Sequence, residues 1–454
     1  MSSNGHNYID TEPVSKIFMR YLIPSLIGMM VMAVNIVVDG IMVGNALGEV
    51  ALAGVGIASP VYTLFLAMSL WIGMGGATLY SQAMGAGRVK HAQFIFSHSM
   101  VLITVFTLII GLTALIFQEP LTYLLGANDE TFQYANDYLV VMLIFGFAFT
   151  LENAVSTFIR NDRNPNLAMT ALVVAAVSNI GINYVVLFVL DLGVREVALG
   201  TILSAVFGIL VMTAHFFKKQ NNLKLVRFKF DVPLFKDTMS IGFPSFLAEV
   251  GISVFTIAFN VTLSILVGTV GVAAFSILNY VHSVMLMMFL GMAAAVQPLV
   301  SYYHGAKSTE RIRQTVRIAL ITAVVAGLAA FLVGLIGTRQ IVAIFGDFSA
   351  DVVSMATTGI RLFFIAYLFM GVNFVMMSYF QSISQIRMAT WITASREIIF
   401  MMIFILILPQ FIGVYGVWLS IPLAELIVMI TVLLYIRKSP DFSWLFKRKD
   451  KKAT

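Results

Sequence analysis

The side chains that could do chemistry in this sequence are few, and most lie singly inside long apolar runs. They are four isolated acids and one adjacent pair of opposite charge: Asp39, Glu152, Glu249, Glu425, Arg396 and Glu397. An ionised group among apolar residues costs several kcal/mol unless it faces a cavity or a charge partner. Each acid is therefore a candidate for binding a proton or a cation.

Asp39 is expected to have polar partners. Asn179 and Asn183 are four residues apart, so both lie on one face of a helix, and Thr201 opens the next apolar run at a similar depth. These four residues, the Asp39 cluster, could hold a proton or supply oxygen ligands to a dehydrated Na⁺. The alternative is structural, because Asn and Thr also form ordinary hydrogen bonds between membrane helices.

Three further residues are candidates for the wall of a substrate cavity. Glu152 and its neighbour Asn153 lie in one apolar run and Glu249 in another. A fixed acid in such a wall would attract lipophilic cations. The alternative for Glu152 is a structural carboxyl group held by hydrogen bonds.

Arg396, Glu397, Glu425 and His282 are secondary candidates. The three charged residues can serve as interhelical or local charge partners, and His282 could relay protons or be a satisfied buried histidine. No second histidine lies within a turn of His282, and cysteine is absent. We therefore expect no cofactor and no metal centre, apart from a Na⁺ held by the Asp39 cluster.

Membrane helices must position these residues. The 454 residues are 59% hydrophobic and 11% charged, with a mean hydropathy of +0.94, which excludes a soluble enzyme. A helix needs ~20 apolar residues to cross a bilayer. The apolar runs predict about twelve helices, at approximately 17–45, 52–83, 92–117, 133–160, 166–190, 196–217, 238–267, 271–303, 312–337, 352–380, 389–409 and 413–436.

The positive charges fall in alternate connections between these runs. They form groups that begin with Lys16 and Arg20 and end in the tail, whereas the opposite connections are mostly acidic. Because Lys and Arg are retained on the cytoplasmic side, we expect a multi-pass cell-membrane protein with both termini in the cytoplasm. The net charge of +6 then reflects topology, with membrane lipid near the tail and no nucleic-acid partner.

The sequence also repeats itself at a displacement of 220 residues. This displacement superposes Pro24 on Pro244, Ser81 on Ser301, Gly85 on Gly305 and Val194 on Val414. Chance similarity among apolar helices is the alternative. An even number of helices in each half makes the repeats parallel, related by a pseudo-twofold axis along the membrane normal. We expect an all-α integral membrane protein with two six-helix lobes, 1–217 and 238–436, a cytoplasmic linker 218–237 and a basic cytoplasmic tail 437–454.

Several stretches resemble multidrug and toxic compound extrusion (MATE) transporters, and the resemblance covers the whole chain. They are Val-Asp-Gly-Ile-Met-Val-Gly at 38–44, Ser-Gln-Ala-Met-Gly-Ala-Gly at 81–87, Gln-Pro-Leu-Val at 297–300 and Pro-Leu-Ala-Glu at 422–425. The DinF-like and MepA-like branch fits best. The resemblance implies a central cavity between two lobes and export of bulky organic cations in exchange for H⁺ or Na⁺. It also implies that Asp39, Asn179 and Thr201 bind the coupling ion, and that Glu152 contacts substrate.

Two positions depart from the family pattern. Asn183 stands where relatives commonly carry Asp, so the cluster has one carboxylate instead of two. A lone carboxyl group in apolar surroundings favours its protonated form, and we therefore expect coupling to H⁺ rather than Na⁺. Relatives of another branch carry an acid at the position of Ile252, about one turn after Glu249. Glu249 is therefore not at the same position as that acid, but it lies on the same face of the helix.

The sequence thus predicts a cation-coupled multidrug exporter, expected as a monomer, and not an enzyme. A flippase for a lipid-linked precursor is the alternative, but its cavity would need several basic residues, and the candidates here are mostly acidic. A membrane-embedded enzyme or sensor would need a clustered catalytic set or an extramembrane domain. No nucleotide-binding loop is present, so ATP is not the expected energy source.

Overall fold

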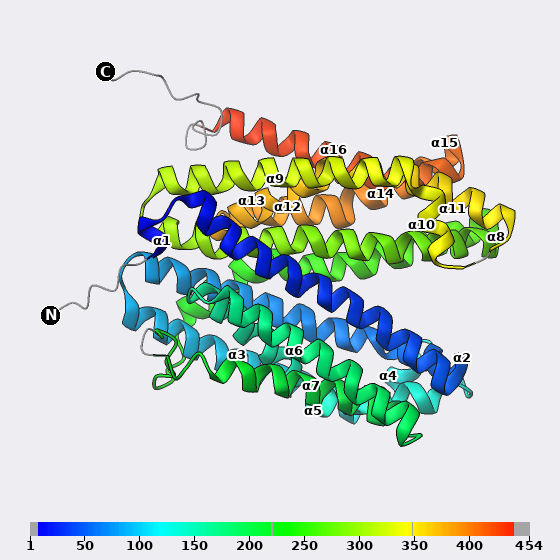
Figure 1. Ribbon diagram of the computed structural model, residues 1–454, viewed down its shortest axis with the longest axis horizontal. Coiled ribbons are helices and arrows are strands. Elements are labelled where there is room, and N and C mark those ends of the chain that lie inside the picture. The colour runs from blue at the N-terminus through cyan, green and yellow to red at the C-terminus, as the bar shows by residue number, and fades with distance from the viewer. Residues whose placement is uncertain (1–7, 219–220, 347, 440–454) are drawn as a thin grey trace. The chain divides into compact units, whose positions relative to one another are not determined.

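Helices are the only regular secondary structure in the residues described by the structure, a computed structural model covering 8–218, 221–346 and 348–439 (Figure 1). Ten helices in this part of the chain are long and apolar enough to cross a membrane. Two of them, α2 (Val14–Gly85) and α8 (Val232–Gly305), are each interrupted by one non-helical glycine, and each supplies two spans. The expected all-α fold of about twelve spans is therefore confirmed. Asp347 and most of the predicted basic tail, from residue 440 onward, lie outside the described residues.

The other elements follow in chain order. In the first half they are α1 (Tyr8–Thr11), α3 (Val89–Ile116), α4 (Gln118–Leu124), α5 (Phe132–Asn161), α6 (Pro165–Tyr184), the π-helix η1 (Val185–Val189) and α7 (Val194–Thr213). In the second half they are α9 (Thr309–Ile336), α10 (Thr338–Ile344), α11 (Ala350–Phe363), the 3-10 turn η2 (Phe364–Ala366), α12 (Tyr367–Ser382), α13 (Ile386–Ala394), the π-helix η3 (Ser395–Ile399), α14 (Phe400–Ile407), α15 (Pro409–Ile412) and α16 (Val414–Lys438).

The internal repeat is visible in the bounds of these helices. The helices α3 and α9 begin and end at positions related by the displacement of 220 residues, and so do α4 and α10. The glycines that interrupt α2 and α8, Gly48 and Gly268, obey the same displacement. So do Gly87 and Lys307, which follow the two long helices with φ of 73° and 55°. The repeat expected from sequence is therefore a repeat of local structure.

Gly48 lies where the two arms of α2 meet. Its φ of 84° and ψ of −178° belong to a region that only glycine adopts readily. Gly268 has a similar backbone, with φ of 66° and ψ of −147°. A single glycine in each half therefore allows one membrane span to reverse into the next.

The described chain divides into two compact units. The N-terminal unit contains Arg20–Ser253 and Gly305–Lys307, and the C-terminal unit contains the other described residues. The core of the N-terminal unit includes Phe65 of α2, Phe149 of α5 and Ile202 of α7. Close packing of such side chains between helices stabilises this unit.

The first turns of α8 belong to the N-terminal unit because they pack closely on the second arm of α2. A Cβ added to Gly75 would clash with the carbonyl oxygen of Thr238, and one added to Gly242 would clash with that of Trp71. The Trp71 indole Nε1 donates a 2.7 Å hydrogen bond to the carbonyl oxygen of Met239. Small residues thus let the two backbones approach, as is common between membrane helices.

Asp162, directly after α5, ties the linker to α2 and to the turn that follows α7. Its carboxylate accepts hydrogen bonds from the Tyr80 hydroxyl at 2.8 Å and from the backbone N–H of Asn222 at 3.0 Å. It also lies 2.8 Å from Nε2 of His215. All three contacts are with buried or partly buried groups, so this end of the unit is held by a polar cluster that the sequence pattern did not reveal.

The linker is also held against α3. The ring of His98 stacks on Phe228 and Phe230, with ring centroids 5.7 and 5.9 Å apart. The Ser97 hydroxyl accepts a 2.8 Å hydrogen bond from the backbone N–H of Val226. This part of the linker therefore lies on the surface of the N-terminal unit.

Candidate ion-binding site

Asp39 lies on the first arm of α2, nine residues before the reversal at Gly48, and its side chain is partly buried. Its Oδ1 atom accepts a hydrogen bond from Nδ2 of Asn183, which α6 presents from the last turn before η1. The carboxylate is therefore held by a neutral amide donor and has no ion-pair partner in the part of the chain that the structure describes.

The other members of the Asp39 cluster lie around Asn183. The side chain of Asn179, one turn earlier on α6, donates from Nδ2 to the Thr201 hydroxyl at 3.3 Å. Nδ2 of Asn183 lies 3.5 Å from Oδ1 of Asn179. Asn179 and Asn183 are both buried. The structure thus brings together all four residues that the sequence singled out.

Space for the Asn183 carboxamide depends on Gly200 of α7. A Cβ at Gly200 would stand 2.5 Å from Oδ1 of Asn183 and 2.9 Å from the side chain of Ile182. That Oδ1 atom is buried and has no hydrogen-bond partner among the described residues. Asn183 therefore donates hydrogen bonds from Nδ2 to Asp39 and Asn179, while its acceptor atom Oδ1 is unused.

The chain leaves the α-helical geometry directly after this cluster. Residues Val185–Val189 form the π-helix η1, which begins two residues after Asn183. Short π-helical segments are often found at functional sites, because they break the regular hydrogen-bond ladder. Here η1 ends the straight part of α6 just beyond the residue that contacts Asp39.

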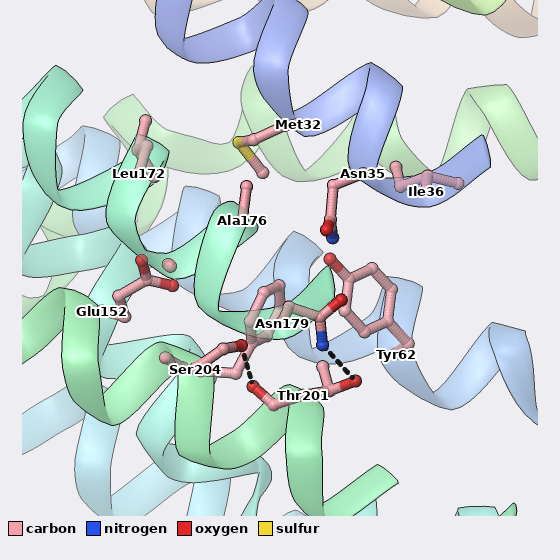
Figure 2. A pocket seen from close by; sticks show the side chains of 13 residues that line it. Met32, Asn35, Ile36, Tyr62, Glu152, Leu172, Ala176, Asn179, Thr201 and Ser204 are labelled. Atoms are coloured by element: carbon pink, nitrogen blue, oxygen red, sulfur yellow. Dashed lines mark hydrogen bonds between the residues drawn. The ribbon is translucent and has the colours of Figure 1, made fainter. Parts of the chain in front are cut away.

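A small pocket adjoins the cluster inside the N-terminal unit (Figure 2). Its volume is about 60 Å³, and its walls come from α2, α5, α6 and α7. Asn179 and Thr201 belong to both the pocket wall and the Asp39 cluster. Pockets for drug-sized ligands measure roughly 300–1,000 Å³, whereas one water needs about 10–15 Å³. The pocket therefore has room for a few waters or a small ion, but not for a bulky organic cation.

Glu152 of α5 lies in the wall of this pocket. Figure 2 shows it on the opposite side from Asn35 and Tyr62, whose polar ends point toward one another. Glu152 is 4% exposed, and its Oε1 atom has no hydrogen-bond partner among the described residues. Gly208 of α7 faces it, since a Cβ at Gly208 would stand 2.6 Å from that oxygen.

The other two residues predicted for a substrate cavity do not line this pocket. Asn153 points elsewhere, and its Nδ2 atom donates to the carbonyl oxygen of Phe149 one turn earlier, at 3.1 Å. Glu249 is buried on α8 within the N-terminal unit. The structure thus separates Glu152 from its sequence neighbour and brings it to the Asp39 cluster instead.

The secondary charged candidates form a separate network in the C-terminal unit. Arg396 lies in η3, where its guanidinium binds the carboxylate of Glu397 and lies 3.5 Å from Oε1 of Glu425. Asn373 donates to the other oxygen of Glu425 at 2.6 Å. The guanidinium also lies 3.8 Å from the ring centroid of Phe374. These charges largely satisfy one another.

His282 lies in an aromatic environment of the C-terminal unit. Its Nδ1 atom is 3.1 Å from the Tyr367 hydroxyl, and its ring contacts those of Phe255 and Phe363 at 5.4 and 5.0 Å. Within the described residues, no three His, Cys, Asp or Glu side chains gather in a metal-binding arrangement. His282 is thus a buried histidine with a hydroxyl partner.

The sequence reasoning missed three polar residues of the pocket, Asn35, Tyr62 and Ser204. Asn35 precedes Asp39 by four residues, so the helical period already put both on one face of α2. Ser204 follows Thr201 by three residues on α7, and its hydroxyl donates to the Thr201 carbonyl oxygen at 2.7 Å. Tyr62 gave no such signal, because tyrosines are common in membrane helices.

A sequence model of the MatE family matches residues 24–185 and 244–407 of this chain. The multidrug export protein MepA of Staphylococcus saprophyticus is 23% identical over 436 residues, which cover 94% of this chain and 95% of that protein. MepA of Staphylococcus aureus strain MSSA476 is 24% identical over 437 residues, with coverage of 94% and 95%.

Solved structures agree in fold. An outward-facing multidrug resistance MATE family transporter of the MOP superfamily superposes with a TM-score of 0.90 at 24% identity, covering 99% of this chain and 100% of that one. A MOP superfamily transporter from Pyrococcus furiosus gives the same TM-score, identity and coverage. The two-lobe fold expected from the sequence is therefore confirmed.

Proposed function

The chain belongs to the MatE family, and on this basis we propose that it is a multidrug exporter that expels bulky organic cations in exchange for protons. The family match spans both halves of the chain, and the curated relatives are named as multidrug export proteins. Alternating access between the two lobes would move the cation, with the coupling ion bound in the N-terminal unit. Such a transporter is not an enzyme.

The observation that carries the proton assignment is the hydrogen bond from Asn183 to Asp39. An amide N–H is a donor and cannot coordinate a cation, yet it occupies the position beside the only carboxylate of the cluster. A Na⁺ ion prefers several oxygen ligands, and a cluster with a single carboxylate offers it little charge. A proton needs only the carboxylate itself.

The unused acceptor atom Oδ1 of Asn183 suggests how the site accommodates both ionised and protonated Asp39. Ionised Asp39 accepts a hydrogen bond from Nδ2 of Asn183. Protonated Asp39 would instead donate, and rotation of the carboxamide would present Oδ1, which now has no partner. The amide can therefore form a hydrogen bond with Asp39 in either protonation state. The rotation of the carboxamide that accompanies the change can be transmitted through α6 to η1.

Substitution of Asp39 by Asn tests this proposal. The substitution keeps the size and the hydrogen bond to Asn183 but fixes the site as neutral, so we expect normal insertion and efflux reduced to background. Everted vesicles would be given a proton gradient or a Na⁺ gradient separately, and uptake of ethidium and a panel of other aromatic cations would be followed. Glu130→Gln, an exposed acid outside the site, is the control.

Each arm of this experiment has a distinct meaning. Normal proton-driven transport by Asp39→Asn would show that Asp39 does not couple transport. Transport by the natural protein on a Na⁺ gradient alone, at constant pH, would overturn the choice of ion. Failure of the natural protein to move any cation of the panel would remove the exporter assignment itself.

A further inference from the structure

Glu152 is a buried carboxyl group that forms no ion pair with any described residue. It is 4% exposed, and no Lys, Arg or His lines its pocket. Its Oε1 atom has no hydrogen-bond partner in the described part of the chain. An ionised carboxylate that is buried without a hydrogen-bond donor or a counter-charge beside it is strongly disfavoured. A group of this kind is held neutral by taking up a proton.

The groups that face Glu152 come from every helix around the pocket. The arm of α2 before Gly48 contributes Asn35 and the arm after it Tyr62, while α6 contributes Asn179 and α7 contributes Thr201 and Ser204. Only Tyr62 among them is titratable, and it lies within electrostatic range of Glu152, Asp39, Glu249 and Tyr138. None of the groups that line the pocket carries a positive charge that could neutralise Glu152.

The pocket joins Glu152 to the Asp39 cluster. Asn179 and Thr201 line the pocket that contains Glu152, and Asn179 also contacts Asn183, which binds Asp39. The volume of about 60 Å³ excludes an aromatic cation from this arrangement, although a few waters would fit. In this state Glu152 cannot be neutralised by substrate.

We propose that Glu152 is a second proton-binding site of the N-terminal unit, and that an arriving organic cation displaces protons from both Glu152 and Asp39. The proposal rests on the proposed function for its second half, while proton binding by Glu152 does not depend on it. Two carboxyl groups that share polar neighbours titrate as a coupled pair, so loss of the first proton makes loss of the second harder. A positive charge brought in by substrate removes that penalty.

Gly208 fits this role. Its missing side chain leaves space for the carboxyl group, since a Cβ there would stand 2.6 Å from Oε1 and 3.2 Å from Cδ of Glu152. Gly208 and Gly200 are eight residues apart on α7, and they face the two polar groups Glu152 and Asn183, respectively. The helix α7 therefore leaves space beside Glu152 and beside the amide partner of Asp39.

The first test counts protons on the purified protein. In weakly buffered detergent solution with a pH-sensitive dye, tetraphenylphosphonium would be added, and the protons released per bound cation would be measured. We expect about two for the natural protein and about one each for Glu152→Gln and Asp39→Asn. The same count for Glu152→Gln and the natural protein would overturn the proposal, because a permanently protonated structural carboxyl releases nothing.

The second test needs no substrate. Infrared difference spectra across a pH titration would show the carbonyl stretch of protonated carboxyl groups. Compared with the natural protein, we expect one band to be missing in Glu152→Gln and a different band to be missing in Asp39→Asn. Identical spectra for Glu152→Gln and the natural protein would overturn the proposal. So would loss of the Glu152 band on addition of Na⁺ at constant pH, because the site would then bind Na⁺.

Gly208→Ala keeps the carboxyl group and fills the space beside it. We expect the Glu152 band to shift in this variant, whereas Gly56→Ala, where a Cβ would meet no atom within 4 Å, should leave it unchanged. If Glu152→Gln does not fold, the natural protein and Gly208→Ala still decide the outcome. If no cation is bound or transported but the two bands titrate, the exporter function fails while the second proton site stands.

Discussion

Asn183 is the residue that distinguishes this site from one with two carboxylates. Its amide donates to Asp39, and its buried oxygen is free of protein partners among the described residues. In Asn183→Asp the donor is lost, and a second carboxylate faces the first across a hydrogen-bonding distance. Two such groups share a proton at low pH and bind a cation better when both are ionised.

We therefore expect Asn183→Asp to acquire transport driven by a Na⁺ gradient at constant pH, which we do not expect of the natural protein. The measurement is cation uptake into everted vesicles with and without the Na⁺ gradient, and Asn153→Asp provides a matched control, because Asn153 lies outside the cluster and bonds to its own helix. Unchanged ion dependence in Asn183→Asp would mean that the carboxylate count does not select the ion.

Among the helices, the two reversals depend most clearly on the type of residue at one position. Gly48 and Gly268 have positive φ and extended ψ, a conformation that costs other residues of order 1–3 kcal/mol. We expect Gly48→Ala and Gly268→Ala each to lower the free energy of unfolding by about that amount, although a Cβ would meet no atom at either position. Thermal unfolding of the solubilised protein would measure the loss.

Gly56→Ala is the matched control for these variants. It also has no atom near its added Cβ, but it lies in a regular helix, where replacing Gly by Ala stabilises by about 0.5–1 kcal/mol. Equal effects at Gly48 and Gly56 would contradict the role of backbone geometry, because only the conformation differs between the two sites.

The sequence predicted the membrane spans well, because a run of about twenty apolar residues has few other stable structures. The span expected at 133–160 is α5, Phe132–Asn161, for example. The short helices α4 and α10 were not expected, since their seven residues lie beyond the apolar runs. Asp39 and Glu152 were identified singly from their charge. The pocket that joins Glu152 to Asn179 and Thr201 of the Asp39 cluster could not be predicted, because it depends on how side chains such as Tyr62 pack between helices.

At the scale of the whole molecule, the two halves share helix bounds but not chemistry. In the repeat of 220 residues, Phe259 is equivalent to Asp39, and Ile421 is equivalent to Thr201. Phe259 is part of an aromatic cluster with Phe255 and Phe275. The C-terminal unit thus lacks a counterpart of the Asp39 cluster at the equivalent positions, and its charges lie instead around Arg396. The proton binding that we propose for the Asp39 cluster would therefore belong to one half only.

Membrane orientation gives the prediction that concerns the entire chain. Lys224 is exposed on the linker, and Asp129 is exposed between α4 and α5. With both termini in the cytoplasm, an impermeant thiol reagent should label Asp129→Cys in intact cells, and Lys224→Cys only after the cells are permeabilised. The natural chain has no cysteine, so it serves as an unlabelled background. Labelling of Lys224→Cys in intact cells would reverse the orientation.

The reversal at Gly48 also bears on how the chain enters the bilayer during synthesis. One residue with non-helical backbone separates the two arms of α2. Because no loop separates the two arms, we expect the first arm not to insert into the bilayer long before the second arm has been synthesised. We expect the two arms to be released together as a helical hairpin, with the backbone polar groups of each already satisfied. Because Gly268 repeats the arrangement, biogenesis of each half would begin with the insertion of such a pair.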